Sequence, residues 1–75
     1  MELTNILDIC DVIYEYGTYI SINEIVNDTN IDRKTVSEVL SLLTEYEIIE
    51  NNNNKYKVKM EYSDAYDTII SKYKW

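Results

Sequence analysis

Apolar side chains recur at helical spacing near the start of the chain. They line one face of a helix predicted over residues 4–16, with acidic side chains on the opposite face. We expect Thr4 to cap the start of this helix and Gly17 to end it, because a hydroxyl accepts from free backbone N–H groups and glycine adopts a left-handed turn without strain. The β-prone residues 18–20 then predict one short strand. The apolar face comprises Ile6, Ile9, Cys10 and Ile13.

A short helix is predicted directly after this strand. Ser21 and Glu24 have the spacing of a capping box, in which each side chain accepts a hydrogen bond from a backbone N–H at the helix start. Ile20 and Ile25 flank this cap at the positions that form a hydrophobic staple. These signals predict a helix over residues 22–28.

A second helix start follows at once. Asn30 tolerates a left-handed conformation better than other non-glycine residues, so we expect it to form the turn. Asp32 is expected to cap a helix over residues 33–46. Residues 21–46 are thus predicted to form two helices joined by a turn of about four residues, which is a helix-turn-helix. The apolar face of the second helix comprises Val36, Val39, Leu40 and Leu43.

The pattern then changes to that of a β-hairpin over residues 48–59. Residues 48–50 and 55–59 are predicted as strands, and the four asparagines between them as the turn, with its tight part at Asn52 and Asn53. The second strand alternates between apolar and basic side chains, so one face is expected to meet the core and the other water. The inward positions are Tyr56 and Val58, and the outward positions are Lys55, Lys57 and Lys59.

The chain closes with an amphipathic helix predicted over residues 63–75. Ser63 or Asp64 is expected to cap it, and Lys72 and Lys74 favour its C-terminal end through the helix dipole. With 75 residues, the chain is expected to form one small domain, mainly α with a small β-hairpin (α+β). The apolar positions of the last helix are Tyr66, Ile69, Ile70 and Tyr73.

The composition argues against catalytic and metal sites. The chain has no histidine and only one cysteine and one glycine, so it lacks a Ser-His-Asp or Cys-His device, a zinc ligand set and a phosphate-binding loop. Cys10 lies in an apolar run and is expected to be a small buried hydrophobe. We therefore expect no enzyme, no cofactor and no metal.

No targeting or membrane segment is expected either. The N-terminus lacks a basic stretch, and no apolar run approaches the ~18 residues of a membrane span. These features predict a cytoplasmic protein.

The charge is unevenly distributed along the chain. The net charge is −7, which by itself argues against a nucleic-acid partner. However, residues 1–32 contain seven acidic residues and no basic one, so a polarised molecule is possible. The basic residues form three later clusters: Arg33 and Lys34; Lys55, Lys57 and Lys59; Lys72 and Lys74.

The order helix, strand, helix, turn, helix, hairpin is that of a winged helix. Residues 18–59 resemble the winged helix-turn-helix domains of bacterial and archaeal transcription regulators of the IclR, MarR and TrmB types. The features that match are the capped segment 21–25, the turn at Asn30, the polar and basic helix start at 33–36, and the leucine ladder before the wing. Asn30 replaces a turn glycine of these families, and Glu47 replaces the glycine that usually ends their recognition helix.

This resemblance implies a sequence-specific DNA-binding protein that regulates transcription. Helix 33–46 would enter the major groove, and the wing, residues 51–59, would follow the backbone or the minor groove. The alternatives are a solvated helix start and a lysine-guarded edge strand, although cations at a helix start oppose the dipole. The implied DNA contacts are Arg33, Lys34, Thr35, Ser37, Glu38, Ser41, Lys55, Lys57 and Lys59.

The resemblance also implies a homodimer formed through the first and last helices. The alternative is that the last helix only closes the core of its own protomer. The implied dimer residues are Ile6, Ile13, Tyr66, Ile69, Ile70 and Tyr73.

An alternative function is a winged-helix protein-interaction module that does not bind DNA. In that case the acidic face of the first helix would dock a basic partner. A third and weaker idea is an acidic DNA mimic. The acidic face comprises Asp8, Asp11 and Glu15.

Overall fold

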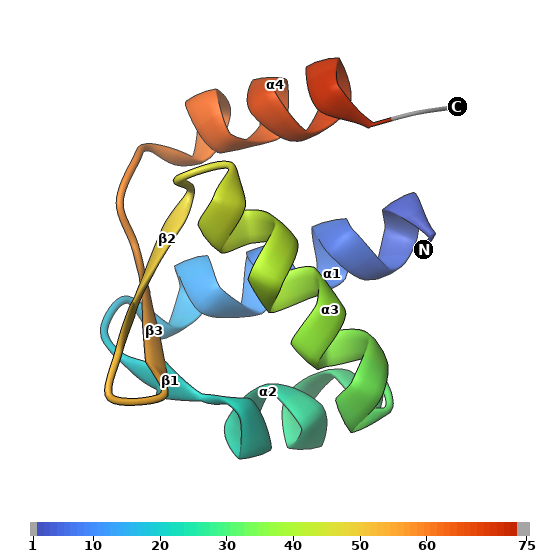
Figure 1. Cartoon of the computed structure of the whole chain (residues 1–75), viewed down its shortest axis with the longest axis vertical. Coiled ribbons are helices and arrows are strands. Elements are labelled where there is room, and N and C mark those ends of the chain that lie inside the picture. Colours follow the sequence, from blue (N-terminus) through green and yellow to red (C-terminus); the bar gives the residue numbers. More distant parts are fainter. Residues whose placement is uncertain (1, 74–75) are drawn as a thin grey trace.

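The computed structural model describes residues 2–73 (Figure 1). Within these residues the chain forms four α-helices and a three-stranded antiparallel sheet. The fold is therefore α+β and mainly helical, as the sequence predicted. The elements in chain order are α1 (Leu3–Tyr16), β1 (Ile20–Ser21), α2 (Ile22–Thr29), α3 (Arg33–Glu45), β2 (Ile49–Asn52), β3 (Lys55–Val58) and α4 (Tyr62–Lys72).

The core lies where the helices meet one face of the sheet. In Figure 1, α1 lies behind α3, α2 runs below them and α4 crosses above. Every buried side chain in the described part of the chain is apolar. The apolar faces predicted for the first helix and for helix 33–46 are confirmed, because all of their members are at most 2% exposed: Ile6, Ile9, Cys10, Ile13, Val36, Val39, Leu40 and Leu43.

The predicted caps of α2 and α3 are confirmed. Ser21 Oγ accepts from the Glu24 N–H at 3.3 Å, and Glu24 Oε1 accepts from the Ser21 N–H at 3.0 Å. Asp32 Oδ2 accepts from the Thr35 N–H at 3.0 Å. Asn30 closes α2 in the left-handed conformation, with φ at 61°. The turn between the two helices is thus fixed by local hydrogen bonds at both ends.

The C-terminal end of α3 carries a left-handed glutamate. Glu47 has φ at 61°, and its N–H donates to the Thr44 carbonyl at 3.0 Å. The next N–H, from Ile48, donates to the Leu43 carbonyl at 3.0 Å. These two bonds are those of a Schellman motif, whose left-handed position is usually glycine. The helix itself ends at Glu45, one residue before the predicted end, because these two bonds replace the regular bonds between residues four positions apart.

The hairpin turn lies one residue later than predicted. The positive φ values fall on Asn53 (54°) and Asn54 (63°), and not on Asn52. Two consecutive residues of positive φ are typical of the type I′ turn that matches the strand twist. Asn52 instead pairs with Lys55 and extends β2. The prediction of a tight turn at Asn52 and Asn53 is therefore wrong by one position.

The sheet has the strand order β1-β3-β2. β1 pairs with β3 through Ile20 opposite Tyr56, and the predicted strand at residues 18–20 is shifted to the two residues of β1. Along β3, Tyr56 and Val58 are half-buried and pack against the core, while Lys55 and Lys57 are exposed. The alternation predicted for this strand is confirmed.

The predicted cap of α1 is wrong. This helix begins at Leu3, so Thr4 lies inside the first turn, and Glu2 at the N-cap makes no side-chain cap bond. Leu3 packs against the core, which accounts for the earlier start. The predicted end is confirmed, because Gly17 closes α1 in the left-handed conformation with φ at 77°.

The predicted cap of α4 is wrong for a similar reason. The helix begins at Tyr62, so Ser63 and Asp64 lie within it, and Glu61 at the N-cap makes no side-chain cap bond. The Tyr62 side chain contacts α1, and this contact favours the earlier start. The helix ends at Lys72. The predicted extension to residue 75, with Lys74, lies outside the described residues.

Candidate nucleic-acid interface

The polar face of α3 carries most of the side chains that the sequence assigned to DNA. Thr35 is half-buried, and its hydroxyl donates to Asp32 Oδ1 at 2.8 Å. It therefore supports the start of its own helix. The exposed members of the face are Arg33, Lys34, Ser37, Glu38 and Ser41.

The two basic residues of α3 have different surroundings. The guanidinium of Arg33 donates to the side-chain oxygen of Asn23 on α2. Lys34 lies near Asp32, and the hydrogen bonds from Thr35, with a smaller contribution from Lys34, hold the pKa of the Asp32 carboxyl below its usual value. Asn23 was missed from the sequence, because nothing local indicates that it meets Arg33 across the turn.

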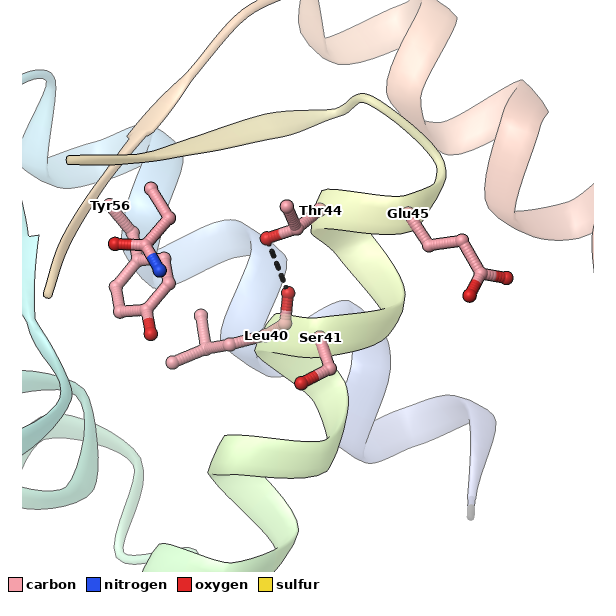
Figure 2. Close-up of a pocket in the computed structure, with 6 residues that line it drawn as sticks. Leu40, Ser41, Thr44, Glu45 and Tyr56 are labelled. Carbon is pink, nitrogen blue, oxygen red and sulfur yellow. Dashed lines mark hydrogen bonds between the residues drawn. The ribbon is translucent and has the colours of Figure 1, made fainter.

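A shallow groove separates α3 from the hairpin (Figure 2). Its α3 side is formed by residues of the last two turns, where the Thr44 hydroxyl donates to the Leu40 carbonyl at 2.8 Å. Tyr56 forms the facing wall from β3, as Figure 2 shows. The groove thus links the exposed face of α3 to the hairpin. Its lining residues are Leu40, Ser41, Thr44, Glu45, Asn51 and Tyr56.

Lys55 and Lys57 lie on the sheet face opposite the one that packs on the core. Lys57 pairs across the hairpin with Glu50, and its Nζ lies 5.5 Å from the centroid of the Tyr19 ring. The Tyr19 hydroxyl donates to Glu50 Oε2 at 2.5 Å. Lys57 is therefore held in a cluster with a carboxylate and an aromatic face of its own chain.

The other two hairpin lysines also have acidic neighbours. Lys59 Nζ lies 3.8 Å from Glu47 Oε1. Lys55 makes a small contribution to the lowered pKa of Glu24, whose main cause is the hydrogen bond from the Tyr16 hydroxyl at 2.5 Å. Because these acids come from α2, the end of α3 and β2, their positions were not predicted from the charge pattern along the sequence.

The candidate surface is consequently close to neutral. The five basic residues assigned to DNA share α3, the hairpin and the start of α2 with six carboxylates, so their positive charge is offset locally. The helix N-termini add only partial positive charge. The basic residues are Arg33, Lys34, Lys55, Lys57 and Lys59, and the acidic ones are Glu24, Asp32, Glu38, Glu45, Glu47 and Glu50.

The start of α2 joins the two groups of basic residues. Arg33 reaches it through Asn23, and Lys55 pairs with Ser21 directly before it. Figure 1 shows α2 between the hairpin and the start of α3. The cations from the two segments therefore lie on either side of one helix N-terminus.

The residues assigned to a dimer interface fall into two groups. Ile6, Ile13 and Ile69 are each 1% exposed and belong to the core of the protomer, so in this fold they cannot contact a second copy. Tyr66 is 43% exposed, whereas Ile70 and Tyr73 are half-buried. Burial of Ile69 and Ala65 agrees with the alternative that α4 closes its own core.

The single cysteine is buried, and its thiol stays protonated at neutral pH. Cys10 is 2% exposed, and burial, with a smaller contribution from Asp11, raises the pKa of its thiol to about 12. Its prediction as a small buried hydrophobe is confirmed.

No group of three or more potential metal ligands comes together within residues 2–73. Among the helices formed by the same residues, none combines the length and the apolar content needed to cross a membrane.

No protein-family model, curated protein or solved structure matches the chain.

Proposed function

We propose that the chain is a winged helix-turn-helix protein that binds double-stranded DNA and regulates transcription. The observation that carries the proposal is the placement of exposed cations beside two neighbouring capped helix starts, those of α2 and α3. Arg33 and Lys55 flank the start of α2, and Lys34 is exposed next to Arg33 in the first turn of α3. Because the capping side chains already accept from N–H groups at these helix starts, the attraction for phosphate oxygens would come mainly from the cations.

In this proposal α3 lies in the major groove. Its first turns would face base edges, where Arg33 can pair with a guanine and Glu38 can accept from a cytosine amino group. Ser37 and Ser41 lie one and two turns further along the exposed face and extend the contact. The hairpin, whose turn is formed by Asn53 and Asn54, would follow the adjacent backbone or the minor groove.

The near-neutral surface sets the expected strength of binding. A phosphate that meets Lys57 must compete with the nearby carboxylate of Glu50, and Lys59 must exchange its ion pair with Glu47 for a phosphate. Non-specific affinity would therefore be low, since that affinity comes mainly from released counterions. Specific binding would depend on the few base contacts of α3.

Fluorescence anisotropy with fragmented genomic DNA tests the proposal. We expect binding that weakens steeply as salt is raised, because each phosphate contact releases counterions. If no salt-sensitive binding is found below about 100 mM salt, where such contacts are strongest, the DNA-binding proposal is wrong.

A protein-interaction module that does not bind DNA is the second candidate. It is favoured by the carboxylate beside each hairpin lysine and by the net charge of −7. The same titration separates the two candidates, because this function requires no affinity for DNA at any salt concentration.

A further inference from the structure

A second groove lies between α1 and the start of α4. Its walls are Asp11, Tyr14 and Glu15 from α1 and Tyr62 from α4. The two helices are joined there by a hydrogen bond from the Tyr62 hydroxyl to Asp11 Oδ1 at 2.7 Å. The two acids were expected on the polar face of the first helix, but the two tyrosines were not predicted there, because they are 48 positions apart and give no local signal.

Two of the residues that line this groove are tyrosines, and a third tyrosine ring lies beside them. The Tyr14 and Tyr62 rings meet edge to face with centroids 5.3 Å apart, and Tyr66 stacks beside Tyr62 at 6.4 Å. Tyr62 and Tyr66 are 45% and 43% exposed. Within residues 2–73 the only other large hydrophobic side chain exposed to this degree is Tyr16. An open cluster of rings is therefore present at one place on the surface.

The charged groups around these rings are acidic. All charged residues of α1 are carboxylates, and α4 adds Asp64 and Asp67 in its first two turns. The carboxylate of Glu15 is exposed and makes no ion pair within the described part of the chain. Lys72, the basic residue of α4, lies at the other end of the helix over the Tyr46 ring. Among residues 2–73, no cation thus forms an ion pair with a carboxylate of the groove.

The tyrosine hydroxyls stay neutral over the physiological pH range. Burial, with smaller contributions from neighbouring groups, raises the pKa of Tyr14 to about 12, and its hydroxyl donates to the Met60 carbonyl at 2.6 Å. The hydrogen bond to Asp11 is the largest of the causes that raise the pKa of Tyr62 to about 12. The charge of the groove therefore comes from its carboxylates alone.

We propose that the groove between α1 and α4 binds an arginine side chain in a basic segment of a partner protein. A guanidinium is planar, stacks on aromatic faces and donates in a fork to carboxylates, so it matches both features of the groove. An anionic ligand such as DNA would be repelled. Binding here does not depend on whether α3 binds DNA.

A second copy of the chain is a poorer occupant. It could offer only one arginine, Arg33, which already donates to Asn23. A partner protein with an exposed basic segment has no such limit.

A titration followed by 15N NMR tests this proposal on the full chain. The probe is a short peptide of arginine, glycine and serine, with matched peptides that carry lysine or citrulline in place of arginine. We expect saturable binding with shifts centred on Asp11, Tyr14, Glu15, Tyr62 and Tyr66. The arginine peptide should bind roughly threefold to tenfold more tightly than the lysine peptide, because an ammonium group cannot stack on a ring or donate two parallel hydrogen bonds to a carboxylate. The citrulline peptide should not bind, because citrulline carries no charge.

Two charge reversals provide a matched pair for the same titration. Glu15→Lys should weaken binding of the arginine peptide about tenfold, because it replaces an attraction by a repulsion at the groove. Glu38→Lys makes the same change in net charge on α3 and should leave the affinity within about twofold. Tyr66→Leu removes an exposed ring and should weaken binding roughly threefold. Thermal melting checks that each variant folds.

Several results would overturn the proposal. These are no saturable binding, equal effects of Glu15→Lys and Glu38→Lys, equal affinity for the arginine and citrulline peptides, or shifts confined to α3 and the hairpin. Sedimentation that shows a dimer dispersed by Tyr66→Leu would assign the groove to a second copy instead. DNA anisotropy of Glu15→Lys is a separate measurement, so failure of the groove and failure of the DNA proposal are distinguishable.

Discussion

Glu50 lies directly opposite Lys57 across the hairpin, and the Tyr19 side chain interacts with both. The Tyr19 hydroxyl donates to the Glu50 carboxylate at 2.5 Å, and its ring lies under the Lys57 ammonium with the centroid 5.5 Å away. Lys57, which the proposed function assigns to DNA, thus already has a carboxylate and an aromatic ring of its own chain beside it. Any phosphate that meets this lysine competes with Glu50.

Glu50→Gln should therefore increase DNA affinity. The amide keeps an acceptor for Tyr19 but removes the charge that competes for Lys57. One additional phosphate contact would steepen the slope of log affinity against log salt by about 0.9. Anisotropy titrations across several salt concentrations measure this slope.

The control for this prediction is Glu2→Gln, which removes the same charge at the far end of α1. It should leave the slope unchanged. An equal change in both variants would mean that overall charge, and not release of Lys57, is responsible.

Glu47→Gly should stabilise the fold. Glu47 holds a left-handed conformation at the position where a Schellman motif usually has glycine, and this costs a non-glycine residue about 1–2 kcal/mol. The exposed ion pair with Lys59 that is lost contributes little. A gain of about 1 kcal/mol corresponds to a melting temperature higher by roughly 4–8 °C.

Glu45→Gly is the matched control, because Glu45 is the last residue of α3 and has helical geometry. It should lower stability by about 0.5–1 kcal/mol. A lower melting temperature for Glu47→Gly would show that its side chain contributes more than the strain it causes.

The capping acids should make stability dependent on pH in the acidic range. The pKa of Asp32 is lowered in the folded chain by the hydrogen bonds from Thr35. Its contribution is therefore complete above the usual carboxyl pKa of about 4 and is lost as the pH falls through the lowered folded value. Thermal melts from pH 7 down to pH 2 should show this loss.

Asp32→Asn keeps a capping oxygen but no longer titrates. Its melting temperature should fall less than that of the wild type between pH 5 and pH 2, a range that brackets the usual carboxyl pKa of about 4. Parallel curves for the two proteins would mean that the Asp32 cap does not contribute to the acid sensitivity.

The helices were predictable where local chemistry defines them. The capping box of Ser21 and Glu24, the Asp32 cap and the left-handed Asn30 depend on residues three or four positions apart. The starts of α1 and α4 were not predictable in this way. Their first residues, Leu3 and Tyr62, are fixed by packing against distant parts of the chain.

A one-residue error in the predicted turn position changes which residues pair across the hairpin. Four identical asparagines give no signal for which two adopt positive φ. A turn at Asn52 and Asn53 would place Glu50 opposite Lys55, whereas the observed turn places it opposite Lys57. The acidic partners of the hairpin lysines were missed because they follow from this register and from tertiary contacts.

The central proposal is tested most directly by DNA anisotropy of a double charge reversal, Arg33→Glu combined with Lys57→Glu. The matched control, Lys72→Glu combined with Lys74→Glu, makes the same change in net charge at the C-terminal end of the chain. We predict that the first variant loses DNA binding while its helicity stays close to that of the wild type, and that the control still binds. The melting temperature of the first variant should fall only slightly, because Lys57→Glu places two carboxylates opposite each other across the hairpin. Wild-type affinity in the Arg33 and Lys57 variant would contradict the assignment of α3 and the hairpin to DNA.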